Sequence, residues 1–114
     1  MNIKIIDGKI TEAELREIAK EFYGEMVKGV VDIEREVVAM GGEYHMDANI
    51  ALAENGSKNN DVWGFNWYFG KDGDEQIEYI SLINIRPELD NRSMEVKNPA
   101  VRAKMKKIIL RYLT

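Results

Sequence analysis

The chain has 114 residues and a net charge of −4, with 45% hydrophobic and 32% charged residues, which is typical of a soluble globular domain and excludes a disordered or fibrous chain. It has no cysteine, which excludes disulfides and cysteine nucleophiles and fits a reducing compartment. No apolar run approaches the roughly 20 residues that cross a bilayer, and no signal peptide is recognisable. We therefore expect one cytoplasmic domain over residues 1–114, with no membrane segment.

A strand and a helix are predicted at the start of the chain. Residues 2–6 form a short apolar run that is typical of a strand. Thr11 and Glu14 then make a capping box, after which apolar residues recur at helical spacing. The pattern predicts a helix that ends at about residue 28.

A hairpin is predicted next. The stretches 30–40 and 43–53 both alternate apolar and polar side chains, and a glycine pair beginning at Gly41 separates them. Two glycines between two such stretches favour a two-residue hairpin turn. In that register Val37 faces Met46, and nearly all the apolar side chains share one face.

The second half of the chain predicts two more strands and a final helix. The strands cover residues 61–69 and 75–85, and the first of them carries a row of aromatic side chains that we expect in the core. Asn98 and Pro99 are typical of a helix start. The predicted order is β-α-β-β-β-β-α, which indicates a two-layer α+β fold with both helices on one face of a mainly antiparallel sheet.

If the hairpin forms, its outer face carries a polar cluster with the only histidine of the chain: Glu34, Glu36, Glu43, His45, Asp47 and Asn49. Facing carboxylates destabilise a sheet unless a positive group lies beside them. A divalent metal held by Glu36, His45 and Asp47 would supply that charge, as would a basic side chain or a basic partner. Because any solvated strand face can carry such residues, we favour a solvated face over a metal site.

A second polar group follows the last predicted strand: Asn84, Arg86, Asn91, Arg92 and Ser93. Two arginines with amides, a hydroxyl and a nearby helix start are suited to binding a phosphate or a carboxylate. The arginines could equally pair with acids of the same segment, and we favour this second interpretation.

Several stretches occur in a fairly specific order: VVDIEREVVAMGGEYHMDANIALAENGS, DVWGFNWYF, INIRP, NRS and NPAVRAKM. With the capped first helix, they resemble a family of small prokaryotic proteins known only as a domain of unknown function. The resemblance spans nearly the whole chain and implies a stand-alone bacterial or archaeal cytosolic protein. It implies no activity, cofactor or catalytic residue.

The sequence contains no recognisable catalytic motif, since neither a phosphate-binding glycine loop nor a nucleophile elbow occurs. We expect a non-enzymatic binding or interaction module that forms a homo-oligomer or binds a protein partner. The alternative is a small metal-dependent enzyme acting on a phosphorylated or nucleotide substrate. A weaker alternative is nucleic-acid binding through the basic residues of the last helix: Lys104, Lys106, Lys107 and Arg111.

The charge distribution bears on these alternatives. Residues 1–85 contain 8 Lys and Arg against 17 Asp and Glu, whereas residues 86–114 contain 8 against 3. Such a split indicates either two surfaces for two partners or a basic helix that folds beside an acidic sheet. We favour the basic helix beside the sheet, and the overall acidity argues against nucleic acid.

Overall fold

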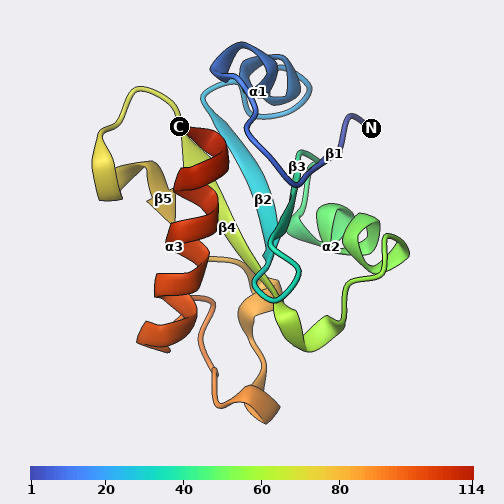
Figure 1. Cartoon of the computed structure of the whole chain (residues 1–114), viewed down its shortest axis with the longest axis vertical. Helices are drawn as coiled ribbons and strands as arrows, with labels where there is room; N and C mark the ends of the chain where they lie inside the picture. Colours follow the sequence, from blue (N-terminus) through green and yellow to red (C-terminus); the bar gives the residue numbers. More distant parts are fainter.

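A five-stranded antiparallel sheet forms the centre of the computed structural model, which describes residues 1–114 (Figure 1). Its spatial order is β1-β3-β2-β4-β5. The strands are β1 (Lys4–Ile6), β2 (Met26–Asp32), β3 (Val37–Met40), β4 (Val62–Tyr68) and β5 (Ile77–Glu78). The predicted α+β class with an antiparallel sheet is confirmed.

The first and last helices begin where the sequence predicts. Helix α1 (Glu12–Ala19) starts at Thr11, whose hydroxyl accepts a hydrogen bond from the Glu14 amide at 3.1 Å. Helix α3 (Pro99–Leu113) starts at Asn98, whose side-chain oxygen accepts from two amides of the first turn. These side chains satisfy amides that have no partner inside a helix.

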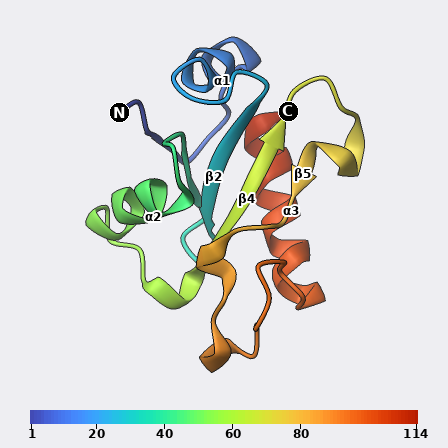
Figure 2. The same ribbon diagram turned by 180° about the vertical axis from the view of Figure 1, so that it is seen from behind.

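Both of these helices bury their apolar stripes in one core. This core joins Leu15 and Ile18 of α1 and Ile109 of α3 to the sheet face that carries Phe65. Trp63 and Trp67, on the same face of β4, lie in this core as well, which confirms the predicted role of the aromatic row. In Figure 1 α3 lies in front of β4, and from behind, in Figure 2, β4 lies in front of α3.

The first hairpin lies elsewhere than predicted. Strand β2 begins at Met26, inside the expected helix, and it pairs with β3 through a turn in which Asp32 faces Val37. The side-chain oxygen of Asp32 accepts from the Glu34 and Arg35 amides, both at 2.9 Å, so a carboxylate organises a turn that contains no glycine. The predicted pairing of Val37 with Met46 is therefore wrong.

The stretch expected as the second strand of that hairpin is a helix, α2 (His45–Glu54). Gly41 and Gly42 both have positive φ, 119° and 94°, and they lead the chain out of the sheet. The Asp47 carboxylate then accepts from the Tyr44 amide at 2.9 Å and from the Glu43 amide at 3.1 Å, which starts the helix.

Helix α2 covers the second face of the sheet. Ala48 and Leu52 pack there against a smaller core formed with Val30, Ala39 and Val62. The prediction of a two-layer fold with an open sheet face is therefore wrong, because helices lie on both faces. On this second face α2 lies over β2 and β3, while residues 80–84 of the segment after β5 lie against β4.

Candidate functional site

The predicted polar face of the first hairpin does not form, because its residues enter a turn and a helix. Glu34 and Glu36 lie in the turn between β2 and β3. The carboxylate of Glu34 lies 3.6 Å from the Lys104 ammonium, and that of Glu36 lies 2.8 Å from the Arg111 guanidinium. Both acids therefore face α3 rather than the residues of α2.

The predicted metal ligands Glu36, His45 and Asp47 do not come together, and this prediction is wrong. Glu36 pairs with α3, Asp47 caps α2, and His45 is buried beneath the same helix. No group of three or more histidine or acidic side chains in the chain is arranged to hold a metal ion. Glu43 and Asn49, the remaining members of the cluster, lie just before α2 and on its partly exposed side.

The second polar group has a structural role in the segment between β5 and α3. The Asn84 carboxamide bonds both the amide and the carbonyl of Gly64, at 2.8 and 3.0 Å. The Asn91 side chain donates to the carbonyls of Asn84, Ser93 and Glu95. These contacts occupy both amides, so neither is free to bind an anion.

The two arginines of that group lie in different surroundings. Arg86 is buried, donates to the Val62 carbonyl and lies over the Trp63 ring, 5.3 Å from its centre. Burial lowers the pKa of this guanidinium. Arg92 is exposed and pairs with Asp90 at 2.9 Å. Arg92 thus has the favoured pairing with an acid of its own segment, Arg86 does not, and anion binding stays an untested alternative.

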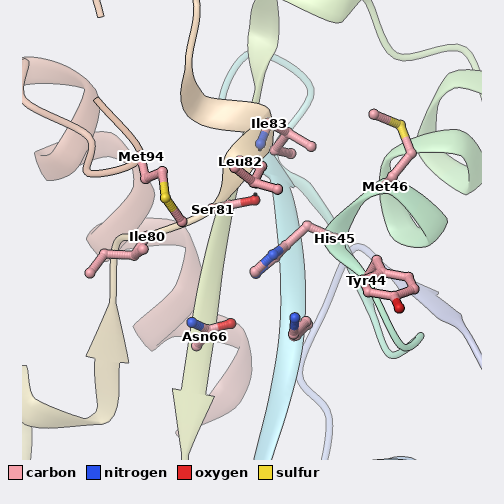
Figure 3. Close-up of a pocket in the computed structure, with 10 residues that line it drawn as sticks. Tyr44, His45, Met46, Asn66, Ile80, Ser81, Leu82, Ile83 and Met94 are labelled. Atoms are coloured by element: carbon pink, nitrogen blue, oxygen red, sulfur yellow. Dashed lines mark hydrogen bonds between the residues drawn. The ribbon is translucent and has the colours of Figure 1, made fainter. Parts of the chain in front are cut away.

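The structure forms a cavity of about 580 Å³ on the second face of the sheet, between α2, β4 and residues 80–83 (Figure 3). Its lining is mostly apolar and includes three polar side chains and one charge. The lining residues are Lys28, Tyr44, His45, Met46, Asn66, Ile80, Ser81, Leu82, Ile83 and Met94.

His45 reaches into this cavity from the start of α2. Its Nε2 lies 2.9 Å from the carbonyl oxygen of Phe65. Because a carbonyl can only accept, Nε2 carries the hydrogen and Nδ1 has the free lone pair. Burial, and to a smaller extent the positive charge of Lys28, lowers the His45 pKa from 6.5 to about 4, so the ring is neutral at pH 7.

Asn66 lies on β4 across the cavity from α2. Its Nδ2 donates to the Glu78 carboxylate at 2.7 Å, and the Tyr68 hydroxyl donates to the same oxygen at 3.1 Å. A carboxylate only accepts, so this contact fixes which end of the carboxamide is the NH₂ group. The other end, Oδ1, is buried without a hydrogen-bond partner.

Ser81 closes the cavity from the segment after β5. Its hydroxyl oxygen accepts from the Ile83 amide at 3.2 Å, which leaves the hydroxyl hydrogen to donate. Gly64 of β4 permits this close approach, since a β-carbon at that position would lie 2.6 Å from the β-carbon of Ser81.

Large apolar side chains extend from the cavity to the surface. Tyr44, Met46, Leu82 and Met94 line the cavity and are all exposed to solvent. Such side chains are normally exposed singly, whereas four around one concave site are typical of a binding surface. The Lys28 ammonium lies 5.8 Å from the centre of the Tyr44 ring, at cation–π distance.

The basic residues of α3 are mostly paired with acids. Besides the contacts of Lys104 and Arg111, the Lys106 ammonium lies 2.5 Å from the Asp74 carboxylate. All three acids belong to the acidic part of the sequence. The basic helix thus lies beside acidic turns, as the charge distribution favours.

Comparison with known families matches residues 4–112 to DUF5674, which is described as a protein of unknown function. The chain belongs to this family. The predicted membership of a domain-of-unknown-function family is thereby confirmed. No curated protein and no solved structure matches the chain. None of the helices in this DUF5674 chain has the length and apolar character needed to span a bilayer.

Sequence reasoning missed most of the site. Only His45 was singled out, and for a strand face rather than for a buried position. A signal existed for Asn66. It lies between Phe65 and Trp67 in the alternating β4 pattern, so its side chain points away from the aromatic row. Ser81 and Met94 had no such signal, because the irregular segment that holds them has no period.

Proposed function

We propose that the chain is a binding protein that holds a small, largely apolar molecule in the cavity between α2, β4 and residues 80–83. The observation that carries this proposal is a cavity of about 580 Å³ with exposed apolar side chains around it and, in its wall, the buried Asn66, whose side-chain oxygen has no hydrogen-bond partner. Small-molecule sites are commonly concave, mostly apolar and about 300–1,000 Å³ in volume, with a few fixed polar groups.

The energetics of the apolar side chains support a ligand. Leu82 is 72% exposed, and burying such a side chain fully contributes about 1.5–3 kcal/mol. A ligand that covers parts of Leu82, Met46 and Met94 removes apolar surface of both partners from water. The buried polar groups would then fix its orientation.

This proposal specifies the binding module expected from the sequence. The metal-dependent alternative loses its three ligands, and most basic side chains of α3 have acidic partners. We also propose that the module acts as one domain in the cytoplasm, which the absence of cysteine supports. Self-association stays a prediction.

Methyl labelling of methionine tests the proposal directly. The chain has six methionines, of which Met46 and Met94 line the cavity, while Met40 and Met105 are fully buried in the other core. Methyl quinoline-3-carboxylate is a suitable neutral aromatic probe without a hydrogen-bond donor. We expect it to shift the methyl signals of Met46 and Met94 and to leave those of Met40 and Met105 in place.

Two variants of α2 provide a matched comparison. Met46 and Ile50 are 49% and 51% exposed, and only Met46 lines the cavity. Met46→Glu should weaken binding of the ester probe, whereas Ile50→Glu should leave it unchanged. Equal weakening by both substitutions, or no shift of the Met46 and Met94 signals, would contradict the proposed function.

A further inference from the structure

Two hydrogen-bond acceptors on buried side chains have orientations that the surrounding chain fixes. Glu78 holds the NH₂ group of Asn66, which leaves Asn66 Oδ1 on the cavity side. The carbonyl of Phe65 holds the N–H of His45, which leaves the lone pair of His45 Nδ1. Neither orientation depends on a ligand, because each is set by a group that can only accept.

The two acceptors belong to one place in the cavity. Figure 3 shows the His45 ring extending from α2 towards Asn66, whose oxygen lies on the side of the carboxamide nearer to the ring. Burial chiefly lowers the His45 pKa, whereas the Asn66 side chain raises it, because a protonated ring could donate to that side chain; this effect indicates that the two groups are close. While the ring is neutral, Oδ1 and Nδ1 cannot bond each other, since both only accept.

The buried Asn66 oxygen destabilises the protein as long as no hydrogen-bond donor reaches it. The side chain is only 7% exposed, and Oδ1 has no partner in the protein. An unsatisfied buried polar atom destabilises the folded protein, because it has lost its hydrogen bonds to water and gained none in return. Each specific unpartnered group in a folded protein calls for an explanation, and a ligand donor is one that fits a cavity.

We propose that the ligand is a neutral planar molecule whose NH₂ group donates one hydrogen to Asn66 Oδ1 and the other to His45 Nδ1. Primary carboxamides and amino-substituted heteroaromatic rings carry such a group beside an acceptor atom. The Ser81 hydroxyl, which retains a hydrogen to donate, supplies the donor for that adjacent acceptor. This inference rests on the proposed function, because it assigns the chemistry of the ligand in the same cavity.

A neutral donor fits this site better than an ammonium group. Burial and the charge of Lys28 both act against a proton on the imidazole itself, and they would act in the same way on a cationic ligand. Glu78 opposes this effect, but its influence on the imidazole is smaller than that of Lys28. The carboxylate is moreover already engaged by Asn66 and Tyr68.

The test compares two probes of nearly equal shape on the full chain. Quinoline-3-carboxamide has the NH₂ group, and methyl quinoline-3-carboxylate lacks it. We expect the carboxamide to bind about tenfold more tightly or better, because only it satisfies the buried acceptors. The nitrogen resonance of the unprotonated His45 Nδ1 should move with the carboxamide and not with the ester.

Substitutions test which side chains cause the preference for the carboxamide over the ester. Asn66→Leu and His45→Phe each remove one acceptor and should reduce the ratio of the two affinities towards one while the ester still binds. Tyr68→Phe removes a hydroxyl that bonds Glu78 outside the cavity, and it should leave the ratio unchanged. The ratio of the carboxamide affinity to the ester affinity is measured on the same variant. A general loss of stability weakens both affinities, whereas loss of an acceptor changes their ratio.

The outcomes distinguish this inference from the proposed function. If both probes bind at Met46 and Met94 with equal affinity, or if the ratio survives both acceptor substitutions, the NH₂ assignment is overturned and the binding cavity stands. If neither probe shifts those methyl groups, the proposed function and the assignment are both overturned. A selective carboxamide that loses its advantage in Asn66→Leu supports both.

Discussion

Lowering the pH should destabilise the folded chain through His45. The native ring has a pKa of about 4, held down chiefly by burial, whereas the unfolded ring has the ordinary value of 6.5. The unfolded state therefore binds more protons than the native state between these values, so stability falls as the pH falls. The contribution of His45 is fully present above pH 6.5 and is lost progressively as the pH approaches 4.

The expected loss is large for a single side chain. At pH 5 the unfolded ring is almost fully protonated and the native ring is mostly neutral, which costs about 2 kcal/mol relative to pH 7.5. His45 is only 8% exposed, so solvent screening reduces this figure little. Urea unfolding followed by the fluorescence of the two buried tryptophans, Trp63 and Trp67, measures it.

A matched variant isolates the histidine from the carboxylates that titrate in the same range. His45→Gln keeps an N–H that can donate to the Phe65 carbonyl, and it does not ionise. The difference in free energy of unfolding between the two proteins should change by about 2 kcal/mol from pH 7.5 to pH 5. The same pH dependence in both proteins, or an NMR titration of this single histidine with a midpoint near 6.5, would show that burial does not lower the His45 pKa.

Three further substitutions test the contacts that shape the site. Gly64→Ala places a β-carbon against Ser81 and should destabilise the chain by about 1–3 kcal/mol in urea unfolding, with a shift of the Met94 methyl signal. Asn84→Ala removes both bonds to the Gly64 backbone and should cost about 2–4 kcal/mol, and a cost near zero would show that those bonds do not hold the segment. Asn98→Ala removes the cap of α3 and should cost about 1 kcal/mol, measured in the same way.

The sequence predicted the starts of α1 and α3 and the buried face of β4 correctly, because each depends on residues close together in the chain. Thr11 with Glu14 and Asn98 with Pro99 define helix starts by side chains that bond nearby amides, and the structure has both helices there. The alternating aromatic residues of β4 likewise identify a buried strand face. The fold class followed from these elements.

The hairpin could not be placed correctly, because its signals were ambiguous. The stretch after Gly42 alternates like a strand, but His45, Ala48 and Leu52 also have the spacing of a helix, and these are the side chains that α2 buries. The true turn contains no glycine and depends on the carboxylate of Asp32 and on a positive φ at Glu36. Neither feature is conspicuous in a sequence.

The cavity was beyond sequence reasoning because it depends on contacts between distant segments. Its polar and charged groups come from β2, α2, β4 and the segment after β5, and the free oxygen of Asn66 is defined only by its contact with Glu78. Once the hairpin was misplaced, His45 was assigned to a water-facing strand. Its burial reverses that assignment, because the ring lies beneath α2 and bonds the Phe65 carbonyl rather than a metal ion.

The most direct measurement is a titration of the methyl-labelled full chain with quinoline-3-carboxamide, followed at the methionine methyl groups and at the His45 nitrogens. We expect the Met46, Met94 and His45 Nδ1 signals to move together along one saturable curve, while the Met40 and Met105 signals stay in place. Signal changes confined to Met1 or spread evenly over the buried methionines would contradict binding in the cavity. An unchanged His45 Nδ1 signal would contradict the proposed contact with the NH₂ group.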